Sequence, residues 1–92
     1  MAKFLMMGKY TTEALQDVSA QRTEKAVAMI KEAGGNVDSM YALLGNYDLA
    51  LIVDFPGVNE AITTSIALTK MTNIAFTTLP ALPVAEFDKI VK

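Results

Sequence analysis

The fold is decided by LGNYDLALIVDFPG at residues 44–57, where an apolar run lies between two aspartates. Gly45-Asn46 is typical of the two-residue connection of a tight hairpin, because both residues tolerate positive φ. The sequence therefore predicts strands at residues 37–44 and 47–55, and Pro56-Gly57 ends the second. In a two-layer domain, polar residues recur on the strand face that meets water. Only the ends of this strand are polar, so we expect another copy of the chain to cover its second face.

On the amino-terminal side, the sequence predicts a strand and a long helix. Residues 3–10 are short and apolar, as in a strand bounded by polar residues. No proline or glycine interrupts residues 13–33, so we expect a helix there, capped by Thr12 and ended by Gly34-Gly35. A break near Ser19 would divide it into a short and a longer helix. The residues that trace its inward face are Val18, Arg22, Ala26, Met29, Ile30 and Ala33.

On the carboxyl-terminal side, Asn59 is the expected cap of a second helix over residues 60–71. Residues 73–79 form the predicted last strand, which Pro80 ends, and residues 85–92 are a short tail. The inward residues expected on the second helix are Ile62, Ile66 and Leu68. The complete order is β-α-β-β-α-β, the ferredoxin-like fold of class α+β: an antiparallel four-stranded sheet with two helices on one face.

The first and third strands are antiparallel neighbours in this fold. One pairing register gives favourable pairs of residues on both faces of these strands. It places the opposite-charge pairs Lys3–Asp54 and Lys9–Asp48 at the two ends of one face. Between them lies an apolar stripe, which we predict to be a dimer interface, and the other face receives the helices. A one-residue slip would move every side chain of a strand to the opposite face. The register is therefore supported by the match of both the charged pairs and the apolar pairs. The stripe pairs Leu5 with Ile52 and Met7 with Ala50, and the other face pairs Phe4 with Val53, Met6 with Leu51 and Gly8 with Leu49.

Composition excludes several classes of function. The 92 residues make one domain, residues 1–92, that is 52% apolar and small enough for oligomerisation to help its stability. A net charge of −2 gives no basic surface for nucleic acid. The chain has no cysteine and no histidine, so it lacks disulfides, thiol catalysis and the commonest transition-metal ligand, and we expect no metal and no cofactor. Its opening apolar run is too short for a signal peptide or a membrane span, so we expect a cytoplasmic protein that does not bind membranes.

Candidate ligand-binding side chains are few: Tyr41, Tyr47, Asp48 and Arg22. Tyr47 has a hydroxyl that can donate a hydrogen bond, and Tyr41 lies in an otherwise apolar strand that suits a cavity wall. Arg22 has the planar fork that holds a carboxylate or a phosphate. Each also has a structural interpretation, since tyrosines favour strands and Arg22 could pair with a nearby acid such as Asp17.

A carboxylate pair is the other catalytic pattern to weigh. Asp48 and Asp54 lie on one predicted strand, and the six residues of extended chain between them span about 20 Å. Two acids so far apart cannot act on one bond within a monomer. We therefore interpret both as ion-pair residues at the rim of the sheet, and the catalytic residues, if there are any, are unknown.

Gly45, Tyr47 and Asp48, followed by an apolar strand, Asp54 and Pro56, resemble the pattern of the GYD-domain family. Further similar residues run in the same order along the chain: Thr12, Arg22, Ala33-Gly34-Gly35, Tyr41, Asn73 and Thr77-Thr78-Leu79. The chain departs from the family pattern at Ala14, Gly57, Thr72 and Ala75. These departures argue against the transfer of a shared active site, and the loss of an arginine common in the family near Asn73 argues in particular against an anion-binding role.

The resemblance implies a ferredoxin-like domain related in shape to the dimeric α/β-barrel proteins, in which two sheets face each other and enclose a cavity. We therefore expect a homodimer or higher homo-oligomer that binds a small apolar or aromatic molecule in that cavity. One alternative is a cofactor-free monooxygenase or isomerase, in which the substrate supplies the reactivity and the protein a dry pocket. Another is a regulatory or assembly module that binds a protein through its sheet edges.

Overall fold

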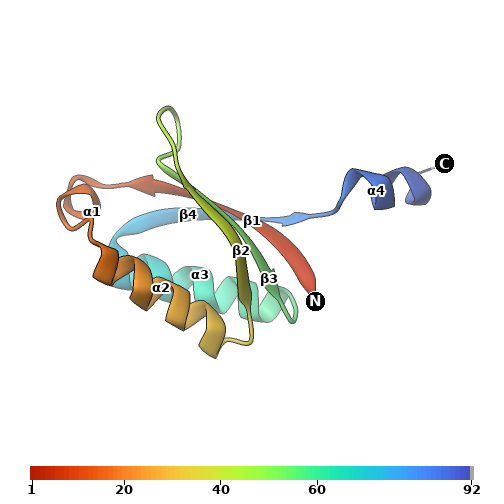
Figure 1. Cartoon of the computed structure of the whole chain (residues 1–92), viewed down its shortest axis with the longest axis horizontal. Helices are drawn as coiled ribbons and strands as arrows, with labels where there is room; N and C mark the ends of the chain where they lie inside the picture. Colours follow the sequence, from red (N-terminus) through yellow and green to blue (C-terminus); the bar gives the residue numbers. More distant parts are fainter. Residues whose placement is uncertain (92) are drawn as a thin grey trace.

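A curved four-stranded sheet with helices on one face forms the body of the computed structural model, which describes residues 1–91 (Figure 1). The elements are β1 (Ala2–Tyr10), α1 (Thr12–Gln16), α2 (Ala20–Glu32), β2 (Asn36–Ala42), β3 (Leu49–Phe55), α3 (Val58–Thr72), β4 (Ile74–Ala81) and α4 (Val84–Ile90). The strand order is β2-β3-β1-β4, and all neighbouring strands are antiparallel. The predicted β-α-β-β-α-β order and ferredoxin-like fold are confirmed.

The register between β1 and β3 is the predicted one. Lys3 lies opposite Asp54 and Gly8 opposite Leu49, and every pair between them is as expected. The ion pair at the first end is also present, because Lys3 Nζ lies 3.1 Å from Asp54 Oδ1. Strand alternation, together with the match of Lys3 to Asp54, was therefore enough to place each side chain of β1 and β3 on its correct face.

The predicted ion pair at the other end, Lys9–Asp48, is wrong. The Asp48 carboxylate accepts the backbone N–H of Tyr10 at 2.8 Å, and the Lys9 ammonium donates to the Asn46 carbonyl at 3.1 Å. The backbone N–H of Asp48 in turn donates to the Gly8 carbonyl at 2.8 Å. Asp48 thus closes the end of the sheet with hydrogen bonds to the backbone, which leaves its carboxylate turned toward Tyr10 instead of Lys9.

The hydrophobic core lies between one face of the sheet and helices α2 and α3. Phe4 and Met6 of β1 and Leu51, Val53 and Phe55 of β3 are at most 3% exposed. The rings of Phe4 and Phe55 meet edge to face, with 5.8 Å between their centroids. The helices complete the core with Ile30 from α2 and with Ala61 and Leu68 from α3.

The break predicted near Ser19 separates α1 from α2. Ser19 caps α2, and its hydroxyl accepts the backbone N–H of Arg22 at 3.0 Å. The cap of α1 is Thr11 and not the predicted Thr12, because the Thr11 hydroxyl accepts the N–H of Ala14 at 3.1 Å. At the far end of α2 the chain turns at Gly34, whose φ of 84° suits glycine.

The hairpin between β2 and β3 is wider than the predicted two-residue turn. Its strands end at Ala42 and begin at Leu49, and the N–H of Leu43 donates to the Asp48 carbonyl at 2.9 Å. Gly45 alone in the connection has a positive φ, 151°, so the type I′ geometry expected for Gly-Asn is absent from it. The hydrogen bonds of Asp48 to β1 hold it at the end of the sheet and leave residues 44–47 as the loop.

Helix α3 differs from its prediction in both its start and its inward face. It begins at Val58 after Gly57, without a side-chain cap, so the expected Asn59 cap is wrong. The predicted inward residues Ile62 and Ile66 are 55% and 52% exposed, whereas Leu68 is buried as expected. Small and hydroxyl-bearing side chains face the sheet instead, which lets the helix approach it closely: Ala61, Thr64 and Thr72 beside Leu68.

The carboxyl-terminal segment runs on past the predicted end of the last strand. β4 continues through Pro80 to Ala81, which is possible because β4 is an edge strand and Pro80 has no N–H to leave unpaired in a ladder. Most of the described part of the predicted short tail, residues 85–92, lies in α4, which extends beyond the end of the sheet (Figure 1). All seven residues of α4 are exposed.

Candidate functional site

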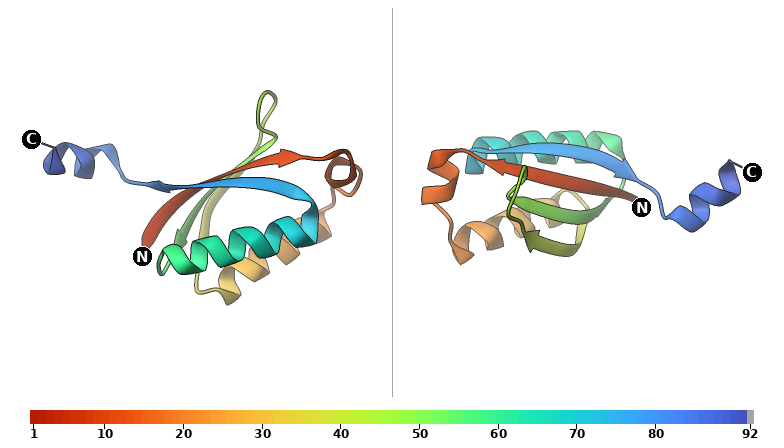
Figure 2. Two further views of the ribbon diagram at one scale, coloured as in Figure 1. Left: turned by 180° about the vertical axis from the view of Figure 1, so that it is seen from behind. Right: turned by 90° about the horizontal axis from the view of Figure 1, so that it is seen from above.

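The face of the sheet that points away from α2 and α3 is the first candidate site, and we call it the open face. Figure 2 shows that the described helices leave it uncovered. The register places on it the predicted interface residues Leu5, Met7, Ala50 and Ile52, together with Tyr41 of β2 and Leu79 of β4. The four interface residues are half-buried within the single chain, Leu79 is 47% exposed and Tyr41 60% exposed.

A charged cluster borders the open face at one end. The ammonium group of Lys3 contacts both Asp54, at 3.1 Å, and Asp38 of β2. The hydrogen bond from Lys3 lowers the pKa of Asp38, and the hydrogen bonds to Asp38 and Asp54 raise the pKa of Lys3. Both Lys3 and Asp38 remain in contact with solvent, so this cluster marks a solvated edge of the open face.

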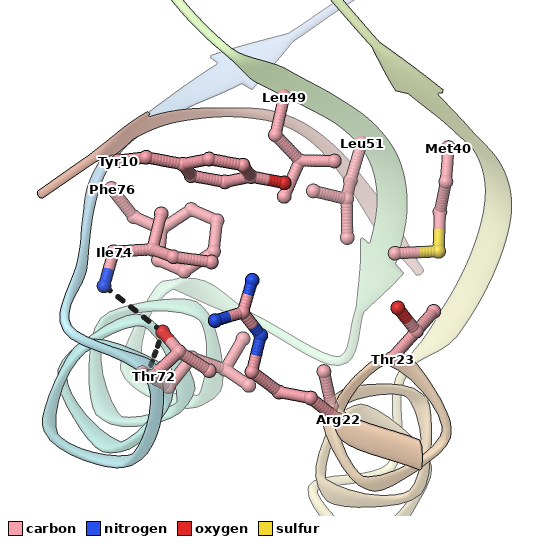
Figure 3. A pocket seen from close by; sticks show the side chains of 11 residues that line it. Tyr10, Arg22, Thr23, Met40, Leu49, Leu51, Thr72, Ile74 and Phe76 are labelled. Carbon is pink, nitrogen blue, oxygen red and sulfur yellow. Dashed lines mark hydrogen bonds between the residues drawn. The ribbon is translucent and has the colours of Figure 1, made fainter. Parts of the chain in front are cut away.

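A second candidate site lies on the opposite side of the sheet, in a cavity between β-strands and α2 (Figure 3). Its volume is about 50 Å³. Arg22 extends into this cavity from the first turn of α2, its Nη1 donates to the Ala14 carbonyl at 2.6 Å, and its guanidinium carbon lies 5.7 Å from the centre of the Tyr10 ring. The cavity walls are mostly apolar, so Arg22 provides its only charge within the described residues.

The four predicted ligand-binding residues do not meet in one site of the single chain. Tyr41 lies on the open face, and Arg22 lies in the cavity on the helix side. Tyr47 and Asp48 belong to the hairpin connection between β2 and β3 and are half-buried. The carboxylate of Asp48 has a structural partner in the N–H of Tyr10, as described above.

Tyr10 lines this cavity, although it is not among the four predicted ligand-binding residues. The alternation of Phe4, Met6 and Gly8 on β1 continues to Tyr10, which therefore lies on the helix side opposite Ile74. Extending that alternation by one step would have found it. The approach of Arg22 to Tyr10 depends on the turn of α1 and has no local signal in the sequence. Within residues 1–91, no group of three acidic side chains lies close enough to hold a metal ion.

None of the described helices is both long and apolar enough to cross a membrane. Comparison with solved structures finds similarity to the leucine response regulatory protein of Mycobacterium tuberculosis, with a TM-score of 0.59 at 11% sequence identity. The match covers 89% of this chain but 51% of the other, so the chain spans about half the length of that regulator, and the likeness is one of fold. No curated protein sequence matches the chain significantly. A family model described as the GYD domain matches residues 4–91.

Proposed function

The chain belongs to the GYD domain family, and on that premise we propose that it is a homo-oligomeric module that binds a small molecule between facing sheets. The open face carries this proposal. Its apolar residues sit on the two central strands, where a monomer would keep them half-exposed. Apolar surface that is contiguous and bordered by charge is typical of an interaction site.

A second copy of the chain is the partner that suits this surface best. In a twofold dimer the same patch serves both subunits, so an apolar stripe packs on its own copy. The Lys3 ammonium offsets one of the two carboxylate charges of its cluster within one chain, which reduces the repulsion between two copies of the cluster. A small domain also gains more from such burial than a large one, because its own core is limited.

The segment at residues 82–91, which we call the arm, supports the same assembly. Five of its large apolar side chains are exposed, at 46% to 72%: Leu82, Val84, Phe87, Ile90 and Val91. Val84, Phe87 and Val91 follow helical spacing and so lie on one side of α4 and its end. The arm leaves the body from edge strand β4, and we infer that it packs on a neighbouring copy.

The ligand proposed for this interface is a small apolar or aromatic molecule. Leu5, Met7 and Ile52 provide an apolar surface, and methionine adapts easily to the shape of what it contacts. Tyr41 lies on the open face together with the polar residues Ser39 and Thr77, and its hydroxyl can orient a ligand that has one oxygen or nitrogen atom. Tyr47 and Asp48 would then border the site from the hairpin.

Native mass spectrometry of gently purified protein tests assembly and ligand together. A dimer with additional mass supports an enclosed site and gives the mass of its ligand. A clean dimer supports the interface but removes support for a tightly held ligand. A monomer at micromolar concentration would contradict the proposal, because the open face would then remain uncovered.

A regulatory module is the second candidate function. The protein from Mycobacterium tuberculosis is named as a leucine response regulatory protein, and its similar fold makes a sensing role worth testing in this chain. Such a module would transmit ligand binding to a partner protein through a sheet edge or the arm. A partner that co-purifies at fixed stoichiometry, and is released when the arm is altered, would favour this function over simple binding.

A further inference from the structure

Arg22 carries a positive charge that the described part of the chain does not neutralise. The ion pairs found in residues 1–91 all belong to Lys3, so the pairing of Arg22 with an acid such as Asp17 that the sequence suggested is absent. One hydrogen bond from its guanidinium is present, from Nη1 to the Ala14 carbonyl. A guanidinium has further N–H donors in the same plane, and these remain available to an acceptor in the cavity.

The surroundings of Arg22 favour an anion over water as that acceptor. Most of the cavity wall is apolar, and it comprises Ala26, Met40, Leu49, Leu51, Leu68 and Phe76 among others. Arg22 is half-buried, so it has lost part of its hydration against these walls, and an anion paired with it would compensate for that loss. The Tyr10 ring stabilises the positive charge but does not neutralise it. Figure 3 shows Tyr10 along the strand side of the space and the Arg22 guanidinium extending toward it from the helix side, so the two side chains face the space from opposite walls.

We propose that this cavity binds a short-chain monocarboxylate, with the carboxylate on Arg22 and the carbon chain against the apolar wall. The planar fork of arginine matches a carboxylate through two parallel hydrogen bonds. At roughly 10–15 Å³ for each water-sized group, a volume of about 50 Å³ holds three to five non-hydrogen atoms. Acetate and propionate have this size. The site lies on the helix side of the sheet, so it does not depend on the oligomer proposed above.

The hydroxyl of Thr72 narrows the choice of ligand further. It donates to the Leu68 carbonyl at 2.7 Å and accepts the N–H of Ile74 at 3.1 Å, so it is already committed within the protein. The Thr23 hydroxyl also donates within the protein, to the Ser19 carbonyl at 3.3 Å, so beyond Arg22 the wall keeps the Tyr10 hydroxyl as a donor. Arg22 and Tyr10 together suit the two oxygens of a carboxylate better than the larger set of oxygens on a phosphate.

An NMR titration of the full chain tests this proposal directly. Propionate and its neutral isostere propionamide are added separately to ¹⁵N-labelled protein at constant ionic strength. We expect saturable shifts with propionate at Arg22, Ile74 and their neighbours, and binding of propionamide weaker by about tenfold or more, because it lacks the charge. Equal binding of the two compounds, or no saturable shift with propionate, would overturn the proposal. Inorganic phosphate binding more tightly than propionate would overturn the choice of carboxylate.

Two variants and one control locate the site. Arg22→Gln should weaken propionate binding by about tenfold or more, while Lys25→Gln, which removes a charge from an exposed position of α2, should leave it unchanged. Because Arg22 also holds Ala14, its substitution can perturb α1. Ala26→Leu fills the cavity while keeping Arg22, and it should also weaken binding by about tenfold. Wild-type affinity in a folded Ala26→Leu variant would refute this location of the site.

Discussion

The two faces of the sheet are built from alternate residues of the same strands, yet they differ in what covers them. On β3, Leu51 and Val53 are at most 1% exposed beneath the helices, whereas Ala50 and Ile52 between them are only half-buried. Both sets are apolar. The assembly that we propose would account for this difference, because the composition of the strand would then reflect burial against another chain as well as packing within its own fold.

Substitution of neighbouring residues on β3 should show this difference most strongly. Leu51→Ala is expected to lower the free energy of unfolding by about 2–5 kcal/mol, because it leaves a cavity in the core. Ile52→Ala should cost about 1 kcal/mol in dilute protein, where the open face meets water. Urea denaturation at low protein concentration measures both values. Equal losses would mean that the open face is already packed within one chain.

Placing a charge on the open face should separate the copies without unfolding them. Ile52→Asp would bury an unpaired carboxylate in the proposed interface, which is expected to weaken the dimer by about a hundredfold or more. Ile62→Asp is the matched control, since Ile62 is 55% exposed on the outer side of α3. Analytical ultracentrifugation gives the dissociation constants, and circular dichroism checks that helix content is kept. An unchanged dimer mass in Ile52→Asp would contradict the interface.

Much of the fold was predictable because strand alternation is a strong signal. The register of β1 on β3 followed from placing Lys3 opposite Asp54 and keeping one face wholly apolar. The hairpin was not predictable from Gly45-Asn46, because the hydrogen bonds of Asp48 to β1 overrode the local turn preference. Such contacts join residues far apart in the chain, and a local pattern does not contain them.

The prediction of which residues of α3 face inward failed for a different reason. Ile62 and Ile66 are the large apolar residues of that helix, and size alone suggested that they face the core. The sheet approaches α3 too closely for them, so small residues such as Ala61 lie inward while the isoleucines are exposed. Helix periodicity fixes which residues share a face but not which face is buried. Here the volume of the side chains decided which face of α3 is buried.

The candidate cavity was only half predictable. Arg22 stood out as the one arginine in the chain, but its environment depends on Tyr10, which lies across the turn of α1. Tyr41, predicted with Arg22, follows β2 onto the open face, so the two residues face opposite sides of the sheet. Assigning side chains to faces before grouping them would have separated the two sites.

The arm extends the comparison between covered and uncovered surface. Phe87 of α4 and Ile66 of α3 are both 52% exposed in the single chain, but only Phe87 belongs to a helix whose residues are all exposed. Phe87→Ala should weaken the oligomer by about tenfold, as for an aromatic residue in the core of an interface. Ile66→Ala should leave it unchanged. Similar small effects of both substitutions on the dissociation constant would remove the arm from the interface.

The smallest expected effect comes from the charged border of the open face, and it depends on pH. The hydrogen bond from Lys3 lowers the pKa of Asp38 below its ordinary value of 3.8. Asp38 therefore contributes stability above that value, and the contribution is lost as the pH falls through the lowered pKa. The pKa of Lys3 is raised above 10.5, so its contribution is present below that pH and is lost as the pH rises past it.

Lys3→Met tests this border because it removes the shared cation and keeps the length of the side chain. Without Lys3 the pKa of Asp38 returns toward its ordinary value, so the urea midpoint should fall less steeply than in wild type as the medium is acidified below 3.8. Lys70→Met, on the exposed side of α3, is the control and should keep the wild-type slope. Parallel curves for wild type and Lys3→Met would mean that solvent already screens the cluster completely. In that case the apolar stripe, and not its charged border, would determine which partner binds to the open face.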